Sequence, residues 1–413
     1  MEFDDCKADD TGIEGLFKVS PNLKKLNLSK NCVDRLTFTD DAVHTIVTHC
    51  PEIEVLSLNG WTDITNISLT YLSQLPCLKE IDLSYCDEVT SAGLQTLLRA
   101  PNQRLQRLIL ADFDTIDERF DQIVDTALVN CIRSHCPNLS TLHISIPVKS
   151  AVTDASLVAM LQGCPLLEDF CCDCSYHPNG VIVSTLASCC PRLKHLFLES
   201  VRFTEADMTY LCRSHPNLES LQLHYCDQSM TDTVIVIIST YCHKLQKFGL
   251  VDSEQVTDAS LCALFKSCPD LWTVRLHFIP HITDLSILTL LQHCLQLRSL
   301  YALYNNQLTE LSVASIAIFC KCLVRLELAS AKVLSEESLI LVSRHCKLLE
   351  KVILYSFEAV SERCIKALLS NCRILNELRV INMKGVQVTD ALKAECVAIA
   401  NRYKGPRVYW EAA

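Results

Sequence analysis

The feature that most constrains the fold is a short pattern, L-x-x-L-x-L, that recurs along the whole chain of 413 residues. From Leu245 onward, each copy starts 26 residues after the one before it. A chain of this length would suggest two or three domains, but self-similarity at a fixed period indicates one quasi-linear array instead. The fourteen copies begin at Leu23, Ile53, Leu78, Leu105, Leu139, Leu167, Leu193, Leu218, Leu245, Leu271, Leu297, Leu323, Leu349 and Leu375.

Each copy has a second half that reads as a helix. A turn leads to segments such as Val256-Thr257-Asp258, in which the Thr is a suitable N-cap and the acidic residue lies at the positive end of the helix dipole. About ten residues with helical apolar spacing follow, and many copies then end in Cys-Pro, where Pro stops the helix. One strand and one helix per repeat is the geometry of a leucine-rich repeat.

The Cys-Pro and V-T-D signals make this chain resemble the cysteine-containing leucine-rich repeats of F-box/leucine-rich-repeat proteins and antagonist-of-mitotic-exit-network proteins. The resemblance covers roughly residues 11 to 402. The expected fold is an α/β solenoid, or horseshoe, of about 14 repeats, with parallel strands on the concave face and helices on the convex face. We expect an N-terminal cap and first helix in 1–22, the repeat array in 23–403, and a closing strand and tail in 404–413.

The 25 cysteines follow from the repeat, because most recur at the helix end or after the strand. Free Cys behaves as a small buried hydrophobe, so we interpret these thiols as reduced core residues. The alternative is a metal site at Cys171-Cys172-Asp173-Cys174. Strand alternation points Cys172 inward and Cys171 outward, so adjacent thiols diverge. We therefore expect no metal and no cofactor. Histidines at helix ends, such as His49, are interpreted as capping groups.

Several functional classes are disfavoured. A net charge of −11 argues against a dedicated nucleic-acid binder, and only 9 glycines argue against phosphate-cradling loops. No apolar run approaches the roughly 18 residues that a membrane-spanning helix needs, and the acidic start does not read as a secretory signal. We expect an intracellular protein, cytoplasmic or nuclear. Catalytic groups should break the repeat consensus, and none does, so we expect no enzyme.

The strands of a solenoid offer the residues that are free to carry specificity. Alternation turns the third, fifth and seventh positions of each copy toward the concave face, where a protein partner would bind. These positions are acidic early in the array and basic late, and they include aromatic residues, although a charged face can also be merely solvated. With Trp272 at the strand edge, the candidate partner-binding residues are Asp82, Asp169, Phe197, Trp272, Arg275, Tyr301, Arg325, Ile353, Tyr355 and Arg379.

One spacing is longer than the others, at 34 residues between the copies that begin at Leu105 and Leu139. The extra stretch is acidic and contains two Phe residues. Insertions in repeat arrays map to surface loops and often carry binding, but a tolerated loop is an equal alternative. The candidate binding residues of this acidic insertion are Asp112, Phe113, Asp114, Asp117 and Phe120.

The resemblance implies protein recognition, as substrate receptor or adaptor in SCF-type ubiquitin-dependent degradation. In that family an F-box ahead of the repeats docks a Skp-type adaptor and, through it, a cullin. The 22 residues before Leu23 are too short for an F-box, and its L-P-x-E-[IL] opening is not found. The adaptor contact therefore depends on an F-box encoded upstream, unless the protein is a repeat-only member that competes with or helps a ligase. The alternative is a leucine-rich-repeat scaffold or regulatory binding protein with no link to a ligase.

Overall fold

The structure is a computed structural model, and its strands follow the predicted period. Each strand from β1 to β14 begins two residues after the start of a predicted copy, as Thr273 does after Leu271. The residues that the structure describes are 15, 17–29, 38–100, 104–111, 124–147, 150–175, 177–329, 335–355, 362–381 and 407–411.

The contacts divide the chain into two compact units, Met1–Phe203 and Thr204–Ala413. Unit 1 alternates strands and helices, and its strands pair in parallel in the order of the sequence. Its elements are β1 Lys25–Asn27, α2 Asp40–His49, β2 Val55–Ser57, α3 Asn66–Leu72, β3 Glu80–Asp82, α4 Ser91–Leu98, β4 Arg107–Ile109, α5 Thr126–His135, β5 Thr141–Ile146, α6 Asp154–Gln162, β6 Asp169–Cys174, α7 Val181–Cys189 and β7 His195–Glu199.

Unit 2 has the same alternation and ends in a strand, β15, that pairs in parallel with β14. Its elements are α8 Glu205–Ser214, β8 Ser220–His224, a 3-10 turn at Asp227–Ser229, α9 Asp232–Tyr241, β9 Lys247–Val251, α10 Asp258–Ser267, β10 Thr273–His277, α11 Asp284–His293, β11 Ser299–Leu303, α12 Glu310–Phe319, β12 Arg325–Ala329, α13 Glu336–His345, β13 Lys351–Tyr355, α14 Glu362–Asn371, β14 Glu377–Ile381 and β15 Arg407–Glu411.

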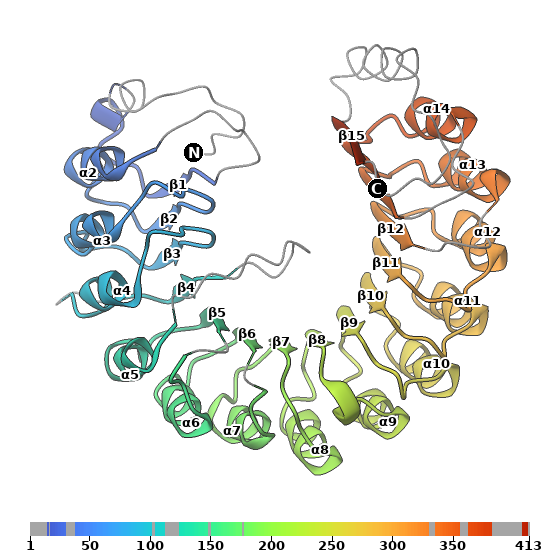
Figure 1. The fold of residues 1–413 in the computed structure, drawn as a ribbon, viewed down its shortest axis with the longest axis horizontal. Helices are drawn as coiled ribbons and strands as arrows, with labels where there is room; N and C mark the ends of the chain where they lie inside the picture. The colour runs from blue at the N-terminus through green and yellow to red at the C-terminus, as the bar shows by residue number, and fades with distance from the viewer. Residues whose placement is uncertain are drawn as a thin grey trace. The chain divides into compact units, whose positions relative to one another are not determined.

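Helices cover one side of the strands in each unit, as Figure 1 shows. The repeat leucines fill the space between the two layers. In the copy that starts at Leu271, the side chains of Leu271, Val274 and Leu276 are fully buried. The other side of the sheet carries no helix among the described residues, and we call it the open face. The expected α/β leucine-rich-repeat solenoid, with parallel strands and helices on opposite faces, is confirmed.

The helix starts also tie one repeat to the next. Asp258, at the start of α10, accepts hydrogen bonds from the backbone N–H of Thr283 at 2.9 Å and from its hydroxyl at 2.6 Å, and the Ser286 hydroxyl donates to the same carboxylate at 2.5 Å. Burial alone would raise the pKa of Asp258, but the hydrogen bonds from Ser286 and Thr283 outweigh it and lower the pKa below its ordinary value. The predicted acidic residue therefore stabilises the following helix as well as its own.

The same contact recurs in consecutive repeats of unit 2. Asp232 accepts from Thr257 and Ser260, and Asp284 accepts from Thr309 and Ser312. In unit 1, Asp40 plays this part for Thr65 and Ser68. The T-D-x-S pattern thus links neighbouring repeats by hydrogen bonds. The Asp carboxylate at one helix start accepts hydrogen bonds from the Thr and Ser hydroxyls at the next helix start.

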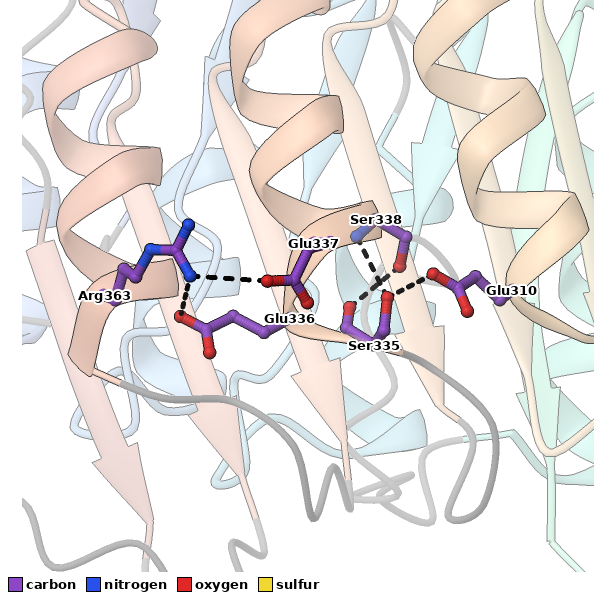
Figure 2. A network of polar contacts seen from close by, with 6 residues as sticks. All are labelled: Glu310, Ser335, Glu336, Glu337, Ser338 and Arg363. Carbon is purple, nitrogen blue, oxygen red and sulfur yellow. Dashed lines mark hydrogen bonds and ion pairs between the residues drawn. The ribbon is translucent and has the colours of Figure 1, made fainter.

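Where Glu replaces Asp, the network changes, as Figure 2 shows. The Ser335 hydroxyl donates to Glu310 Oε1 and accepts the backbone N–H of Ser338 at 3.3 Å. Further along, the Arg363 guanidinium lies 3.3 Å from Glu337 and 3.9 Å from Glu336. The longer side chain keeps the link between helix starts.

The cysteines at helix ends are buried thiols, and the described cysteines are all free. The Cys268 thiol donates to the backbone carbonyl of Cys242 at 3.3 Å, and Cys294 repeats the contact with Cys268 at 3.5 Å. Burial raises the pKa of Cys294 to about 12, so this thiol stays protonated at neutral pH. These positions fit the core interpretation of the thiols.

Three predicted regions lie wholly or largely outside the described residues. They are most of the N-terminal cap in 1–22, the end of the repeat array between residues 382 and 403, and the acidic insertion with Asp112, Phe113, Asp114, Asp117 and Phe120. Within the part of the chain that is described, no helix combines the length and the apolar character that crossing a bilayer requires.

Candidate functional site

The open face of unit 2 carries a row of large side chains at the fifth position of successive repeats. Strand register places Arg275 beside Tyr301, Tyr301 beside Glu327, and Glu327 beside Ile353. Arg379 follows beside Ile353. Because neighbouring parallel strands lie about 4.8 Å apart, these side chains pack against one another across the sheet. The Arg275 guanidinium carbon lies 4.9 Å from the centre of the Tyr301 ring, a cation–π contact.

This close packing buries part of the predicted site. Tyr301 is only 8% exposed, Ile353 4% and Phe197 4%. The repeat positions predicted that these side chains would be available to a partner, and this prediction is wrong for their exposure in the unbound chain. Neighbours in the row cover Tyr301 and Ile353, and Phe197 in unit 1 packs with Ala111 and Cys171. Arg325 is exposed, while Arg275, Tyr355 and Arg379 are half-buried.

Two exposed aromatic side chains of unit 2, Phe278 and Tyr304, lie one position beyond the ends of β10 and β11. The rings of Phe278 and Tyr304 stack, with centroids 4.6 Å apart and planes at 12°, and Tyr355 lies 6.5 Å from Tyr304. Phe278 is 41% exposed and Tyr304 38%. We call Phe278, Tyr304 and Tyr355 the aromatic rim. Of these three residues, only Tyr355 was among the predicted partner-binding residues. Phe278 and Tyr304 could have been found from the sequence, because an aromatic residue stands at the eighth position of two consecutive copies.

The backbone at the rim is in the left-handed region, with φ of 53° at Phe278 and 57° at Tyr304. The turn belongs to the repeat, since Tyr85, Tyr225 and other residues after strands share it. Gly is the residue that this conformation favours, and a bulky side chain there is strained. The fold thus accounts for the turn but not for the aromatic side chains.

Two polar side chains on the strands of unit 2, Glu327 on β12 and His277 on β10, are buried. Glu327 is 5% exposed, and its Oε2 accepts no hydrogen bond from the described residues. Burial raises the pKa of Glu327, and the charges of Lys351 and Arg275 only partly oppose this. His277 is also buried, its Nε2 has no hydrogen-bond partner among the described residues, and burial lowers its pKa to about 3, so the ring is neutral. Buried polar atoms without partners are rare in native folds.

Charged side chains lie beside the row that runs from Arg275 to Arg379. Lys247 Nζ lies 5.0 Å from the centre of the Trp272 ring, and Trp272 Nε1 donates to Gln246 at 3.3 Å. Glu377 forms ion pairs with Lys351, at 3.3 Å, and with Arg379. The basic residues expected late in the array are therefore partly neutralised by acidic neighbours.

The first strands of unit 1 carry smaller polar side chains on the open face, such as Ser57 and Asp82. Asp82 accepts hydrogen bonds from the Ser84 hydroxyl at 2.8 Å and from the Ser57 hydroxyl at 3.2 Å. Phe197 packs with Ala111 and Cys171 rather than standing free. The structure thus places Asp82, Asp169 and Phe197 on the open face, as their positions in the repeat predict, but engages them in contacts within the sheet.

One polar group in unit 1 combines three metal-ligating residue types. His143, Asp169 and Cys171 each present a ligand atom, and these atoms lie within 4.8 Å of one another. His143 Nε2 is 3.2 Å from Asp169 Oδ1, and Cys171 Sγ is 3.7 Å from the same oxygen. From the sequence, Cys171 and Cys172 were considered as ligands, but His143 and Asp169 were not. His143 lies beside Cys171 on the neighbouring strand β5, and Asp169 lies two residues before Cys171 on β6.

No family model matches the chain. Among curated proteins, it is 28% identical to an F-box/LRR-repeat MAX2 homolog of Oryza sativa subsp. japonica, over 51% of this chain and 31% of the relative. It is 30% identical to the F-box protein SKIP1 of Arabidopsis thaliana, over 32% of this chain and 46% of that protein, and 26% identical to F-box protein MAX2 of the same plant, over 51% and 34%. The chain resembles F-box/leucine-rich-repeat proteins. It spans less than half the length of each of these relatives.

A solved structure supports the fold. The chain aligns with one from the crystal structure of the Rad7 and Elc1 complex in yeast, with a TM-score of 0.56, 17% identity, and coverage of 92% of this chain and 81% of that chain. At this identity the similarity concerns the architecture. It agrees with the parallel strands and helices found in each unit.

Proposed function

We propose that this protein is a protein-recognition module that acts as substrate receptor or adaptor in ubiquitin-dependent degradation, within the cell. In this proposal the open face of unit 2 holds the partner, with the aromatic rim at its edge. Arg275, Arg325 and Arg379 are accessible on this face, and the buried side chains of Tyr301 and Glu327 lie in the same row. The proposal treats the chain as a binding protein and not as an enzyme.

The observation that carries the binding part is the exposed stack of Phe278 and Tyr304. Both side chains stand on a backbone conformation that favours Gly, and both remain accessible to solvent. The left-handed turn belongs to the repeat, but the repeat does not require a bulky aromatic side chain at it. Aromatic residues and Arg are also the side chains that most often dominate binding energy in protein interfaces.

The buried carboxylate of Glu327 and the aromatic rim indicate the chemistry of the partner. The free Oε2 of Glu327 calls for a hydrogen-bond donor, and the rim calls for an apolar or aromatic side chain. A partner segment that presents an apolar side chain next to a Lys, an Arg or a backbone N–H would satisfy both. Such a contact would remove the cost of an unpaired buried carboxylate, which is about 1 to 3 kcal/mol.

The ligase part is supported by resemblance. The relatives named above are F-box proteins, and the solved neighbour comes from the complex of Rad7 with Elc1. In F-box/leucine-rich-repeat proteins, the repeats recruit the protein to be ubiquitylated. The predicted Skp-type adaptor and cullin partners belong to this part of the proposal.

Affinity purification of the tagged chain from its native cells, followed by quantitative mass spectrometry, tests the ligase part. We expect a Skp-type or related adaptor and a cullin to be recovered with the chain. We also expect at least one further partner whose level rises when the proteasome is inhibited. Recovery of other partners without any adaptor or cullin would contradict the ligase role and favour a scaffold with no link to a ligase.

A further inference from the structure

Three potential metal ligands converge on the open face of unit 1. Cys171 and Asp169 are two residues apart on β6, so strand alternation points both side chains to the same face. His143 on β5 is the register partner of Cys171. The arrangement therefore follows from the sheet itself, with one ligand directly across the strand and one ligand two residues back.

The distances already approach those of a tetrahedral zinc site. With usual Zn–N, Zn–O and Zn–S lengths, a nitrogen and an oxygen ligand lie about 3.3 Å apart, and a sulfur and an oxygen ligand about 3.5 Å apart. Here His143 Nε2 and Asp169 Oδ1 are 3.2 Å apart, and Cys171 Sγ and Asp169 Oδ1 are 3.7 Å apart. The third pair, Cys171 sulfur and His143 nitrogen, lies within 4.8 Å.

The surroundings favour a bound cation over a hydrated surface cluster. The side chains of His143 and Asp169 are 16% and 22% exposed, and Phe197 packs against Cys171. A carboxylate in such a partly dry site attracts a cation more strongly than a carboxylate at an open surface does.

Cys171 also differs from the other cysteines nearby. Cys172 and Cys174 point into the core, with their sulfur atoms 3.1 Å apart, and Cys190 at the end of α7 is buried with a pKa raised to about 12. All three thiols lie in the core and not on the open face. Cys171 is half-buried and on the open face, so its proton can leave to solvent when a metal binds.

We propose that His143 Nε2, the Asp169 carboxylate and Cys171 Sγ form a zinc site. The donor set is one imidazole, one carboxylate and one thiolate, which suits Zn²⁺ and does not suit Mg²⁺ or Ca²⁺. Binding would release one proton, from the Cys171 thiol to the buffer. Three protein ligands leave a fourth position for water, turned away from the helices. This inference does not depend on the proposed role in ubiquitylation.

The experiment uses the full chain, stripped of metal with a chelator, freed of the chelator and kept reduced with a phosphine. Co²⁺ is titrated in as a spectroscopic probe, and Zn²⁺ affinity is measured by competition with a chromophoric chelator. We expect one tight equivalent of metal per chain and a thiolate-to-cobalt charge-transfer absorption whose intensity corresponds to a single thiolate.

The variants distinguish this site from binding to other thiols. Cys171→Ser and His143→Gln should each weaken Zn²⁺ binding by at least about 100-fold, more than the loss of an outer-sphere partner, and Cys171→Ser should abolish the charge-transfer absorption. Cys189→Ser, which alters a half-buried thiol on α7 in the same unit, should bind as the unmodified chain does. Circular dichroism of the metal-free variants checks their folding.

Two results would overturn the proposal. One is the absence of a tight equivalent in the unmodified chain, which would leave His143 and Asp169 as an ion pair of the sheet only. The other is Zn²⁺ binding by Cys171→Ser and His143→Gln that equals binding by Cys189→Ser, which would assign the metal to other cysteines.

Discussion

The open faces of the two units use the same repeat positions for different chemistry. At the fifth position, unit 1 has Ser57, Asp82 and Cys171, and unit 2 has Arg275 and Tyr301. The inward positions remain apolar in both units. Because the fold needs only the inward residues, the outward ones are free to differ. We infer that unit 1 provides a polar surface with a metal site, and that unit 2 provides the main surface for a protein partner.

The units also differ in regularity. In unit 2 the helix starts of three consecutive repeats are linked through Asp232, Asp258 and Asp284. In unit 1, Asp40 makes the same set of contacts, while Asp154 bonds to Asn179 instead. The repeat spacing is correspondingly constant late in the chain and variable early. A regular spacing holds side chains in register, as a continuous binding surface requires.

The largest effect should come from the aromatic rim. The double substitution Phe278→Gly with Tyr304→Gly should weaken partner binding by about 100-fold, or about 3 kcal/mol, because it removes two aromatic anchors. Stability should change little, since Gly relieves the strain of the left-handed turn while the ring stack is lost. Binding is read by quantitative capture from native cells.

The matched control for this variant is in unit 1. Tyr85→Gly changes an aromatic residue at the same repeat position, with a φ of 58°. It should leave capture unchanged. Equal losses from both variants would mean that the two open faces do not differ in function.

The next effect concerns the links between helix starts. Asp258→Ala should lower the free energy of unfolding of unit 2 by about 2 kcal/mol, because donors on Thr283 and Ser286 lose a charged acceptor. Hydrogen exchange of the backbone amides of α10 and α11 measures this loss of stability. Asp270→Ala, at an exposed acidic residue in the same repeat, should change stability by less than about 0.5 kcal/mol.

The same carboxylate gives a pH dependence. Its pKa in the folded chain lies below the ordinary value of 3.8, so its contribution is complete above that pH and is lost as the pH falls through the folded pKa. The cost of Asp258→Ala should therefore shrink in acid. A cost that stays constant down to acidic pH would contradict the role of the ionised carboxylate.

Glu327 should behave in the opposite way. Its pKa is raised in the folded chain, so the ionised form destabilises the fold at neutral pH, and the cost disappears as the pH falls through the raised pKa. Glu327→Gln should raise the free energy of unfolding by about 1 kcal/mol at neutral pH and weaken partner capture. Destabilisation at neutral pH, measured by thermal denaturation, would show that Glu327 serves the fold and not the partner.

The smallest difference between the units is expected at the cysteines. Burial raises the pKa of Cys164 in unit 1 and of Cys346 in unit 2 to about 12. Both should resist alkylation of the folded chain at pH 8, where the thiolate fraction is roughly one in ten thousand. Peptide mass spectrometry after a short alkylation measures this, with Cys189 as the accessible thiol. Rapid modification of either buried thiol would contradict its place in the core.

The sequence was sufficient to predict the repeated elements, because the period is visible in single residues. Leu271, Thr283 and Cys294 each mark one position of a repeat that recurs many times along the chain. The sequence also identified the outward positions of each strand. The sequence did not show which outward residues are exposed. Their exposure depends on side chains that are about 26 residues away in the chain and lie on the neighbouring strands, as Arg275 and Glu327 do for Tyr301.

The site residues that the sequence missed share a physical cause. His143 and Cys171 occupy the fifth position of consecutive copies, so the repeat makes them register partners, but it does not show that their side chains converge with that of Asp169. Phe278 and Tyr304 stand one residue past the strand, where alternation no longer predicts direction and a left-handed turn sets it instead. Side-chain convergence and turn geometry were the missing information in these two cases.

The most direct test of the central claim places a photoreactive phenylalanine analogue at position 304 in one chain and at position 85 in another, expressed in native cells. Irradiation should cross-link position 304 to a discrete partner that is itself ubiquitylated, and position 85 should give no such product. Cross-linking of that partner from position 85 instead, or from neither position while the partner is still captured, would contradict the assignment of the binding surface to unit 2.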